Sequence, residues 1–190
     1  MICSIDDVIR IVLLVVAPLR STGLLGDSGR RCLKPVEVIP SGSDLLERMQ
    51  AGLPLLGDCT HVLVHEASRP FASRDLALRV LQAAYRHGAA FPAVTSPDPI
   101  YQVEGRRVVR DFSDSTTVLA QSPQAFSCSL LARASLAAGN GGLAIDDEAQ
   151  LVAALGHDVI AVAGEPWNIK LLDTDDVAWL ETLVDDAKPL

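Results

Sequence analysis

The stretch Val62–Pro70, VLVHEASRP, places three polar side chains directly after an apolar run. In open α/β sheets, ligands bind beyond the carboxyl ends of the strands, which is where Glu66, Ser68 and Arg69 would then lie. A carboxylate at this place can hold a magnesium ion, and an arginine can bind a phosphate through paired hydrogen bonds. The same spacing also fits a salt bridge within a loop that leads into a helix, and the local sequence leaves both interpretations open.

Two further stretches carry polar side chains that could face a ligand. Gln121–Phe126, QSPQAF, offers amide donors and acceptors at a bend that Pro123 would fix. Lys170 follows the apolar run Val159–Val162, so its ammonium group could neutralise a phosphate. The alternatives are a structural corner for the first stretch and a solvated surface lysine for the second.

The elements that would position these residues alternate between apolar runs and helical patterns. This alternation is typical of an α/β protein whose mostly parallel sheet is covered on both faces. Ile100–Phe112 differs, because its two extended runs around Glu104–Gly105 predict a β-hairpin that projects and packs on a partner chain. Strands are expected at Ile9–Ala17, Val36–Ile39, His61–Val64, Phe91–Val94 and Val159–Val162, and helices at about 45–53, 73–86, 127–138, 147–155 and 174–184.

Length, charge and composition limit the function classes. The 190 residues fit one domain, 1–190, with a sizeable core and no linker. A net charge of −8 without clustered Lys or Arg argues against nucleic acid as a partner, although a small phosphorylated ligand remains compatible with it. The longest apolar run, Ile11–Pro18, is too short to span a membrane, and the N-terminus lacks a signal-peptide pattern, so we expect a cytoplasmic protein. The widely spaced cysteines favour ordinary thiols over a zinc site.

Four stretches together resemble one family, the 2-C-methyl-D-erythritol 4-phosphate cytidylyltransferases. VLVHEASRP is similar to the family's VLVHDAARP, QSPQAF to QTPQxF, Asp146–Ala149 to T-D-[DE]-A, and Asn168–Lys170 matches NIK. Gly42–Leu53 falls where the family has GGxxRxxSVxxGL. The order and approximate spacing agree, and the resemblance runs from about Ile11 to Val184.

The resemblance implies a Rossmann-like, three-layer αβα nucleotidyltransferase fold and a homodimer built by exchanged β-arms, here residues 98–118. It also implies a reaction of isoprenoid precursor synthesis, in which a sugar-alcohol phosphate attacks the α-phosphate of CTP with Mg²⁺ and releases pyrophosphate. Glu66 then corresponds to the family's metal- and substrate-side aspartate, Arg69 to its arginine near the substrate phosphate, and Lys170 to its C-terminal basic residue. Arg69 and Lys170 are the catalytic candidates. Further candidates are Ser68 and Gln121 for substrate binding, and Gly42, Ser43 and Arg48 for nucleotide binding.

The chain departs from the family where a triphosphate would bind. Family members begin with a strand and a Gly-rich loop, GxGxRxxxxxPK, whose amides and cations cradle the nucleotide. We prefer to align Ile11–Pro18 with the family's second strand, so that the first strand and its phosphate loop are missing. A rival alignment makes Ile11–Ala17 the first strand and Pro18–Pro35 a decayed loop, with Arg30, Arg31 and Lys34 as candidate cations. Neither alignment recovers GxGxR.

Single positions have changed as well. Glu66 replaces an aspartate, which matters because magnesium demands a strict octahedral geometry. Leu45 replaces the arginine of GGxxR, and Asp146 replaces the threonine of T-D-[DE]-A. Asp114 falls near the position at which the family has an arginine in its β-arm, and the charge of this aspartate would repel a phosphate.

These departures predict an N-terminally truncated, degenerate paralogue with absent or weak transferase activity, which acts by binding a ligand or partner. One alternative is an active nucleotidyltransferase whose loop is rebuilt from Ser21–Lys34 or supplied by another subunit. Another is a longer polypeptide whose preceding sequence supplies the loop.

Overall fold

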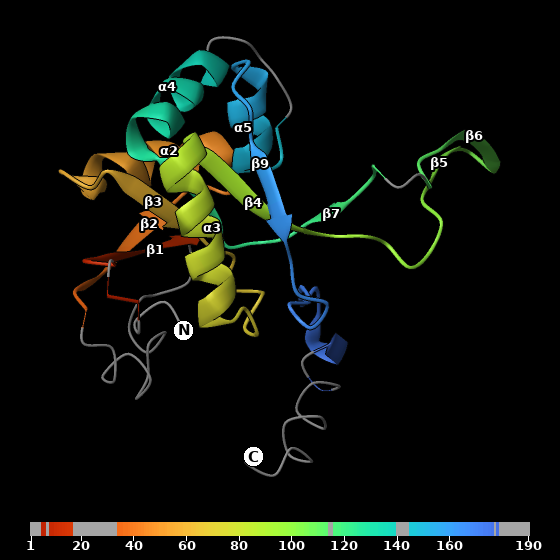
Figure 1. Cartoon of the computed structure of the whole chain (residues 1–190), viewed down its shortest axis with the longest axis horizontal. Coiled ribbons are helices and arrows are strands. Elements are labelled where there is room, and N and C mark those ends of the chain that lie inside the picture. Colours follow the sequence, from red (N-terminus) through yellow and green to blue (C-terminus); the bar gives the residue numbers. More distant parts are fainter. Residues whose placement is uncertain are drawn as a thin grey trace.

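The computed structural model describes residues 5–6, 8–16, 34–113, 116–139, 145–176 and 178 of the chain. Within these ranges the chain forms a five-stranded sheet, a separate pair of strands and a hairpin held away from the body (Figure 1). The expected helix at 174–184 is helical at 174–176 and 178, and its remainder lies outside the described residues.

The central sheet is mixed. Its strands are β3 (His61–Val64), β8 (Gln124–Ser127), β4 (Ala89–Val94), β9 (Ile160–Ala163) and the short β7 (Leu119–Ala120). β8 lies between β3 and β4 and is antiparallel to both, whereas β9 is parallel to β4 and β7 is antiparallel to its end.

The expectation of a mostly parallel sheet is therefore wrong. QSPQAF was expected to form a bend, but Gln124–Ser127 is a central strand that runs antiparallel to both of its neighbours. This strand has four residues, of which only Phe126 has a high strand propensity, so its sequence carries a weak strand signal.

Helices cover both faces of the sheet, and the alternation of side chains along each strand decides which residues they cover. α3 (Arg74–His87) packs on one face, where Leu63, Ala90 and Ala125 join its buried residues. α4 (Cys128–Gly139) and α5 (Glu148–Ala154) pack on the other face with α2 (Leu45–Gly52), against Val62 and Phe126. The expected three-layer arrangement is confirmed.

Polar side chains cap the start of two helices. The Ser73 hydroxyl accepts a hydrogen bond from the Leu76 amide at 2.9 Å, and α3 ends at Gly88, whose φ of 86° is the left-handed conformation that glycine adopts most easily. The Asp44 carboxylate accepts from the Glu47 amide at 2.7 Å and starts α2.

β1 (Ile11–Val16) and β2 (Val36–Ser41) form a parallel pair of their own. The start of this pair is tied to the body, since the Arg10 guanidinium donates to the Leu55 carbonyl, 2.7 Å away, in the 3₁₀ turn η2 (Leu53–Leu56). In the described part of the chain, β1 pairs with β2 but not with β3.

The projecting hairpin is present as expected. β5 (Tyr101–Glu104) and β6 (Arg107–Asp111) pair in antiparallel fashion around Gly105, whose φ is 60°, and every residue of both strands is exposed. Packing of this arm on a partner stays a prediction. No helix within the described ranges is long and apolar enough to cross a membrane.

Leu76→Ala tests the α3 layer of the core. Leu76 is fully buried, so its truncation should lower the free energy of unfolding by about 2–5 kcal/mol through lost burial and a residual cavity. Leu136→Ala, at a position that is 73% exposed on α4, is the matched control and should change stability by less than about 0.5 kcal/mol. Urea denaturation of both variants measures the difference, and equal stability would contradict the assigned packing of α3.

Candidate functional site

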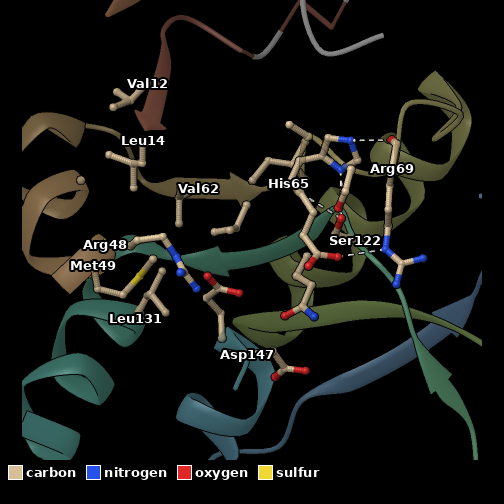
Figure 2. A pocket seen from close by; sticks show the side chains of 18 of the residues that line it. Val12, Leu14, Arg48, Met49, Val62, His65, Arg69, Ser122, Leu131 and Asp147 are labelled. Atoms are coloured by element: carbon tan, nitrogen blue, oxygen red, sulfur yellow. Dashed lines mark hydrogen bonds and ion pairs between the residues drawn. The ribbon is translucent and has the colours of Figure 1, made fainter. Parts of the chain in front are cut away.

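A cavity of about 880 Å³ lies at the carboxyl end of β3, bordered by β1, α2 and the start of α5. It brings together Glu66, Ser68, Arg69, Gln121 and Lys170, all of which were candidates from the sequence. Figure 2 shows Arg69 in this lining, together with Arg48, His65 and Ser122. Arg48 also lines it, from α2. Gly42 and Ser43 are not among its lining residues, so of the three nucleotide-binding candidates only Arg48 reaches the cavity.

Glu66 lies at the centre of a three-residue ion cluster. One carboxylate oxygen is 3.0 Å from Arg69 Nε, and the other is 2.5 Å from Lys170 Nζ. The side chains of Glu66 and Lys170 are 41% and 43% exposed, so this pair remains accessible from the cavity. The fold therefore joins the loops after β3 and β9, which lie about one hundred residues apart in the sequence.

Burial and hydrogen bonding act in opposite directions on the pKa of Glu66. Partial burial alone would raise the pKa, but hydrogen bonds from Lys170 and Arg69 stabilise the carboxylate and lower it overall. Glu66 is therefore ionised at neutral pH and presents a negative charge that a bound phosphate must avoid.

The Arg69 side chain mainly binds backbone groups of the surrounding loops and is little exposed to the cavity. Its side chain is 12% exposed, and Nη1 donates to the Asn168 carbonyl at 2.8 Å while Nη2 donates to the Ala120 carbonyl at 3.3 Å. With Glu66 bound at Nε, one guanidinium connects three segments of the chain. The interpretation as a salt bridge within a loop fits this geometry, and the proposed contact with a phosphate stays a prediction.

The side-chain amide of Gln121 also binds backbone groups of a neighbouring loop. Its amide nitrogen donates to the carbonyls of Glu165 and Asn168, at 2.8 and 3.2 Å, and its amide oxygen accepts from the Glu165 amide at 3.0 Å. Gly164 lies so close that a Cβ there would come within 2.5 Å of the Gln121 oxygen and 2.9 Å of the Ala93 carbonyl oxygen. Gln121 therefore forms the structural corner that was the alternative interpretation of QSPQAF.

Glu165 and Asn168 carry structural roles that the sequence analysis missed. The carboxylate of Glu165 is buried and accepts from the Ser73 hydroxyl at 2.5 Å, with Arg79 3.6 Å away. Asn168 is fully buried and donates to the Ser122 carbonyl at 2.8 Å. Asn168 is the first residue of the NIK motif, so the sequence did mark this position, although only Lys170 was expected to have a role.

His65 holds the loop that carries Glu66. Its Nε2 lies 3.0 Å from the Arg69 carbonyl, which can only accept, so Nε2 carries the proton. Nδ1 then accepts from the Ser122 hydroxyl at 3.1 Å, and the oxygen of that hydroxyl accepts from the Glu66 amide at 3.1 Å. Burial lowers the pKa of His65, which keeps the ring neutral and this hydrogen-bonded chain intact at physiological pH.

Acidic residues form the side of the cavity at the start of α5. Asp146, Asp147 and Glu148 all line it, and the Asp147 carboxylate caps α5 by accepting from the Gln150 amide at 2.7 Å. Burial raises the pKa of Glu148, an effect that the nearby charge of Arg48 opposes. Asp146, which replaces the threonine of the motif, therefore does face the cavity, whereas Asp114 lies outside the described residues.

Binding of Mg²⁺ in the cavity stays a prediction. Both carboxylate oxygens of Glu66 are engaged by cations, and the described ranges hold no group of three His, Cys, Asp or Glu side chains placed to bind a metal ion. The expected role of Glu66 as a metal ligand would need further ligands from water or a bound phosphate, as is usual for magnesium.

Comparison with known proteins decides the family. A family model described as 2-C-methyl-D-erythritol 4-phosphate cytidylyltransferase matches residues 2–186. The chain belongs to this family. It is 42% identical over 133 residues to a cytidylyltransferase of Thermus thermophilus, a match that covers 70% of this chain and 60% of the relative. It is 40% identical over 156 residues to the bifunctional enzyme IspD/IspF of Anaeromyxobacter dehalogenans, covering 80% of this chain and 40% of the relative.

Solved structures of the family share the fold. The Thermus thermophilus cytidylyltransferase superposes with a TM-score of 0.75 at 32% identity, over 94% of this chain and 84% of that one. The 4-diphosphocytidyl-2C-methyl-D-erythritol synthase of Anaerococcus prevotii gives a TM-score of 0.81 at 22% identity, over 94% of this chain and 82% of that one. The nucleotidyltransferase fold expected from the motifs is therefore confirmed. The chain spans 40% to 60% of the length of the curated relatives named above.

Lys170→Met should raise the pKa of Glu66 towards its ordinary value, because methionine removes the first of the two hydrogen bonds that lower it. Since the folded pKa is the lower one, the ion pair stabilises the folded chain above the ordinary pKa of 4.5, and this contribution fades as the pH falls through the folded value. Carbon-13 NMR titration of the glutamate carboxyls measures the shift, with Glu66→Gln to assign the signal. Lys34→Met should leave the signal unchanged, and an unaltered pKa in Lys170→Met would show that the pair does not form.

Proposed function

We propose that this cytidylyltransferase-family protein binds the phosphorylated sugar alcohol of the family reaction in the cavity beside Lys170, and transfers a cytidylyl group from CTP weakly or not at all. The accessible pair of Lys170 and Glu66 carries this proposal. The ammonium group can bind a phosphate, and the carboxylate can accept hydrogen bonds from hydroxyl groups of the same ligand. Ser68, on the same loop as Glu66, adds a hydroxyl to the lining.

The charge balance of the cavity favours a phosphate monoester over a triphosphate. Its described lining carries three side-chain cations, from Arg48, Arg69 and Lys170, against four carboxylates, from Glu66 and residues 146–148. Two unit charges 4 Å apart interact by about 4 kcal/mol at the effective dielectric constant of a protein surface, so an excess of carboxylates opposes a tetraanion strongly.

An active cytidylyltransferase is the second candidate. It is supported by the names of the relatives, including the Bacillus licheniformis cytidylyltransferase, which is 34% identical over 154 residues, 81% of this chain and 67% of the relative. In that case CTP would enter as its magnesium complex, since the side chains of the described cavity do not form a metal site of their own.

Ligand-induced stabilisation and turnover separate the two candidates. With 2-C-methyl-D-erythritol 4-phosphate at one hundred times its dissociation constant, the free energy of unfolding should rise by about 2.7 kcal/mol. Mixing the same ligand with CTP and Mg²⁺ should release no stoichiometric pyrophosphate. Stoichiometric release would establish the active enzyme, and absence of a thermal shift with the sugar phosphate would refute the proposed binding function.

Lys170→Ala should weaken binding of the sugar phosphate, because a charge-assisted hydrogen bond contributes about 1.5–3 kcal/mol, or roughly tenfold to hundredfold in affinity. Lys34→Ala removes a lysine that lies outside the cavity lining and should bind like the parent chain. Isothermal titration calorimetry measures both affinities. Equal affinity in the two variants would remove Lys170 from the site.

We also propose that the chain forms a homodimer through the β5–β6 arm. Val103 and Val108 face each other across the hairpin, and both are more than half exposed although they are apolar. Arg110 lies over the ring of Phe112, 4.5 Å from its centre, at the base of the arm. A small hairpin with no core of its own needs such a surface to be covered, and a second copy would cover it.

Replacing both Val103 and Val108 with lysine should therefore convert dimers to monomers, because the exchanged arms would bury two unpaired charges in each copy. Gln102→Lys, on the same strand and already polar, is the control and should leave the mass unchanged. Light scattering coupled to size exclusion measures the mass, and a dimer that persists in the double variant would contradict the role of the arm.

A further inference from the structure

Two cysteines come together at the amino end of β3, away from Glu66. Cys59 lies just before β3, and Cys128 is the first residue of α4, directly after β8. Both thiols are free and half-buried. The two residues are far apart in the sequence, so it is the pairing of β3 with β8 that brings them close.

Backbone pairing sets the distance between the two cysteines. His61 lies opposite Ser127 in the antiparallel pair. The Cys128 amide donates to the Thr60 carbonyl at 2.9 Å, which continues the same register by one residue. Cys59 is thus one step along the chain from the residue opposite Cys128. Opposed Cα atoms are about 5.5 Å apart in such a pair and one step adds about 3.3 Å along the strand, so the two Cα atoms are about 6 Å apart, within the range of about 4.4–6.8 Å that disulfides span.

The exposure of the neighbouring residues indicates that both thiols turn to the same side. Thr60 and Ser129 are exposed, whereas Cys59 and Cys128 are both half-buried. Burial raises the pKa of the Cys128 thiol, and the charge of Cys59 raises it further. Electrostatic effects between partly exposed groups fade within about 10 Å at ordinary ionic strength, so the two thiols are near neighbours.

We propose that Cys59 and Cys128 form a reversible oxidation site, at which a low-molecular-weight disulfide converts the two thiols into an intramolecular disulfide. In the first step the thiolate of Cys59 attacks one sulfur of the small disulfide, and one small thiol leaves. Cys128 then gives up its proton and attacks the sulfur of Cys59, which releases the second small thiol. The two cysteines lose two protons and two electrons, and the small disulfide takes them up. The reverse exchange with small thiols restores both cysteines.

The bond would join the turn before β3 to the start of α4 and close a loop of about 70 residues. A cross-link over a long loop stabilises the fold, because it removes conformations from the unfolded chain. Glu66 and Lys170 lie beyond the other end of β3, so the bond leaves their side chains accessible. The inference therefore goes beyond the proposed function, and it can be tested without any phosphorylated ligand.

Peptide mapping of the full chain tests the site directly. The chain is equilibrated with oxidised glutathione, alkylated, digested with trypsin and analysed by mass spectrometry without reduction. Each cysteine lies in a tryptic peptide of its own, so the joined peptides identify the pair. The peptides of Cys59 and Cys128 should be joined, and an excess of reduced glutathione should separate them. Glutathione adducts without this cross-link, pairing with Cys3 or Cys32, or no reaction would overturn the proposal.

Serine variants give a matched comparison. Cys128→Ser should abolish the cross-link and leave a glutathione adduct on Cys59, whereas Cys32→Ser keeps the pair and should form the cross-link as the parent chain does. Oxidation should raise the Tm of the parent chain by about 4–16 °C but not that of Cys128→Ser. Circular dichroism checks that both variants fold, and if Cys128→Ser does not, peptide mapping of the parent chain decides alone. A Tm that does not rise in the cross-linked parent would show that the bond strains the fold and would overturn the proposal.

Discussion

A buried set of side-chain to backbone hydrogen bonds holds the carboxyl edge of the sheet together, and the rest of the site depends on it. Gln121 and Asn168 bind backbone groups of loops more than forty residues away in the sequence. Buried peptide groups must be paired, and a loop that packs inside the protein cannot pair them with water. These amides supply the missing partners, which places Lys170, two residues after Asn168, opposite Glu66.

The same constraint explains why so few of the polar residues here remain available to a ligand. Arg69 donates to two backbone carbonyls and to Glu66, and His65 connects the Arg69 carbonyl with Ser122. Each contact fixes a loop at the cost of a group that could otherwise bind a phosphate. Lys170 and Glu66 differ, because their side chains are accessible while their backbone is held by neighbours in the corner.

The cavity has two parts with different chemistry. The charged end adjoins the ion cluster, and the apolar part lies between β1 and β3, which do not pair with each other in the described part of the chain. A sugar phosphate would bind at the charged end, where the side chains of Lys170 and Glu66 are accessible.

By itself, the sequence determined the features that depend on neighbouring residues. Caps at Asp44 and Ser73, the hairpin around Gly105 and the strand His61–Val64 could all be predicted, because turn chemistry and apolar periodicity are local. The motifs also identified the family, and they pointed to Glu66 and Lys170 as residues at one sheet edge.

Only the tertiary structure decided that Gln124–Ser127 is a central strand and that Arg69 and Gln121 serve the scaffold. This strand is stabilised by pairing with β3 and β4 on either side, and a single aromatic residue, Phe126, is too weak a local signal to predict it. The role of a polar side chain likewise depends on which backbone groups are buried near it. Those groups come from distant segments, so their arrangement is known only once the chain has folded.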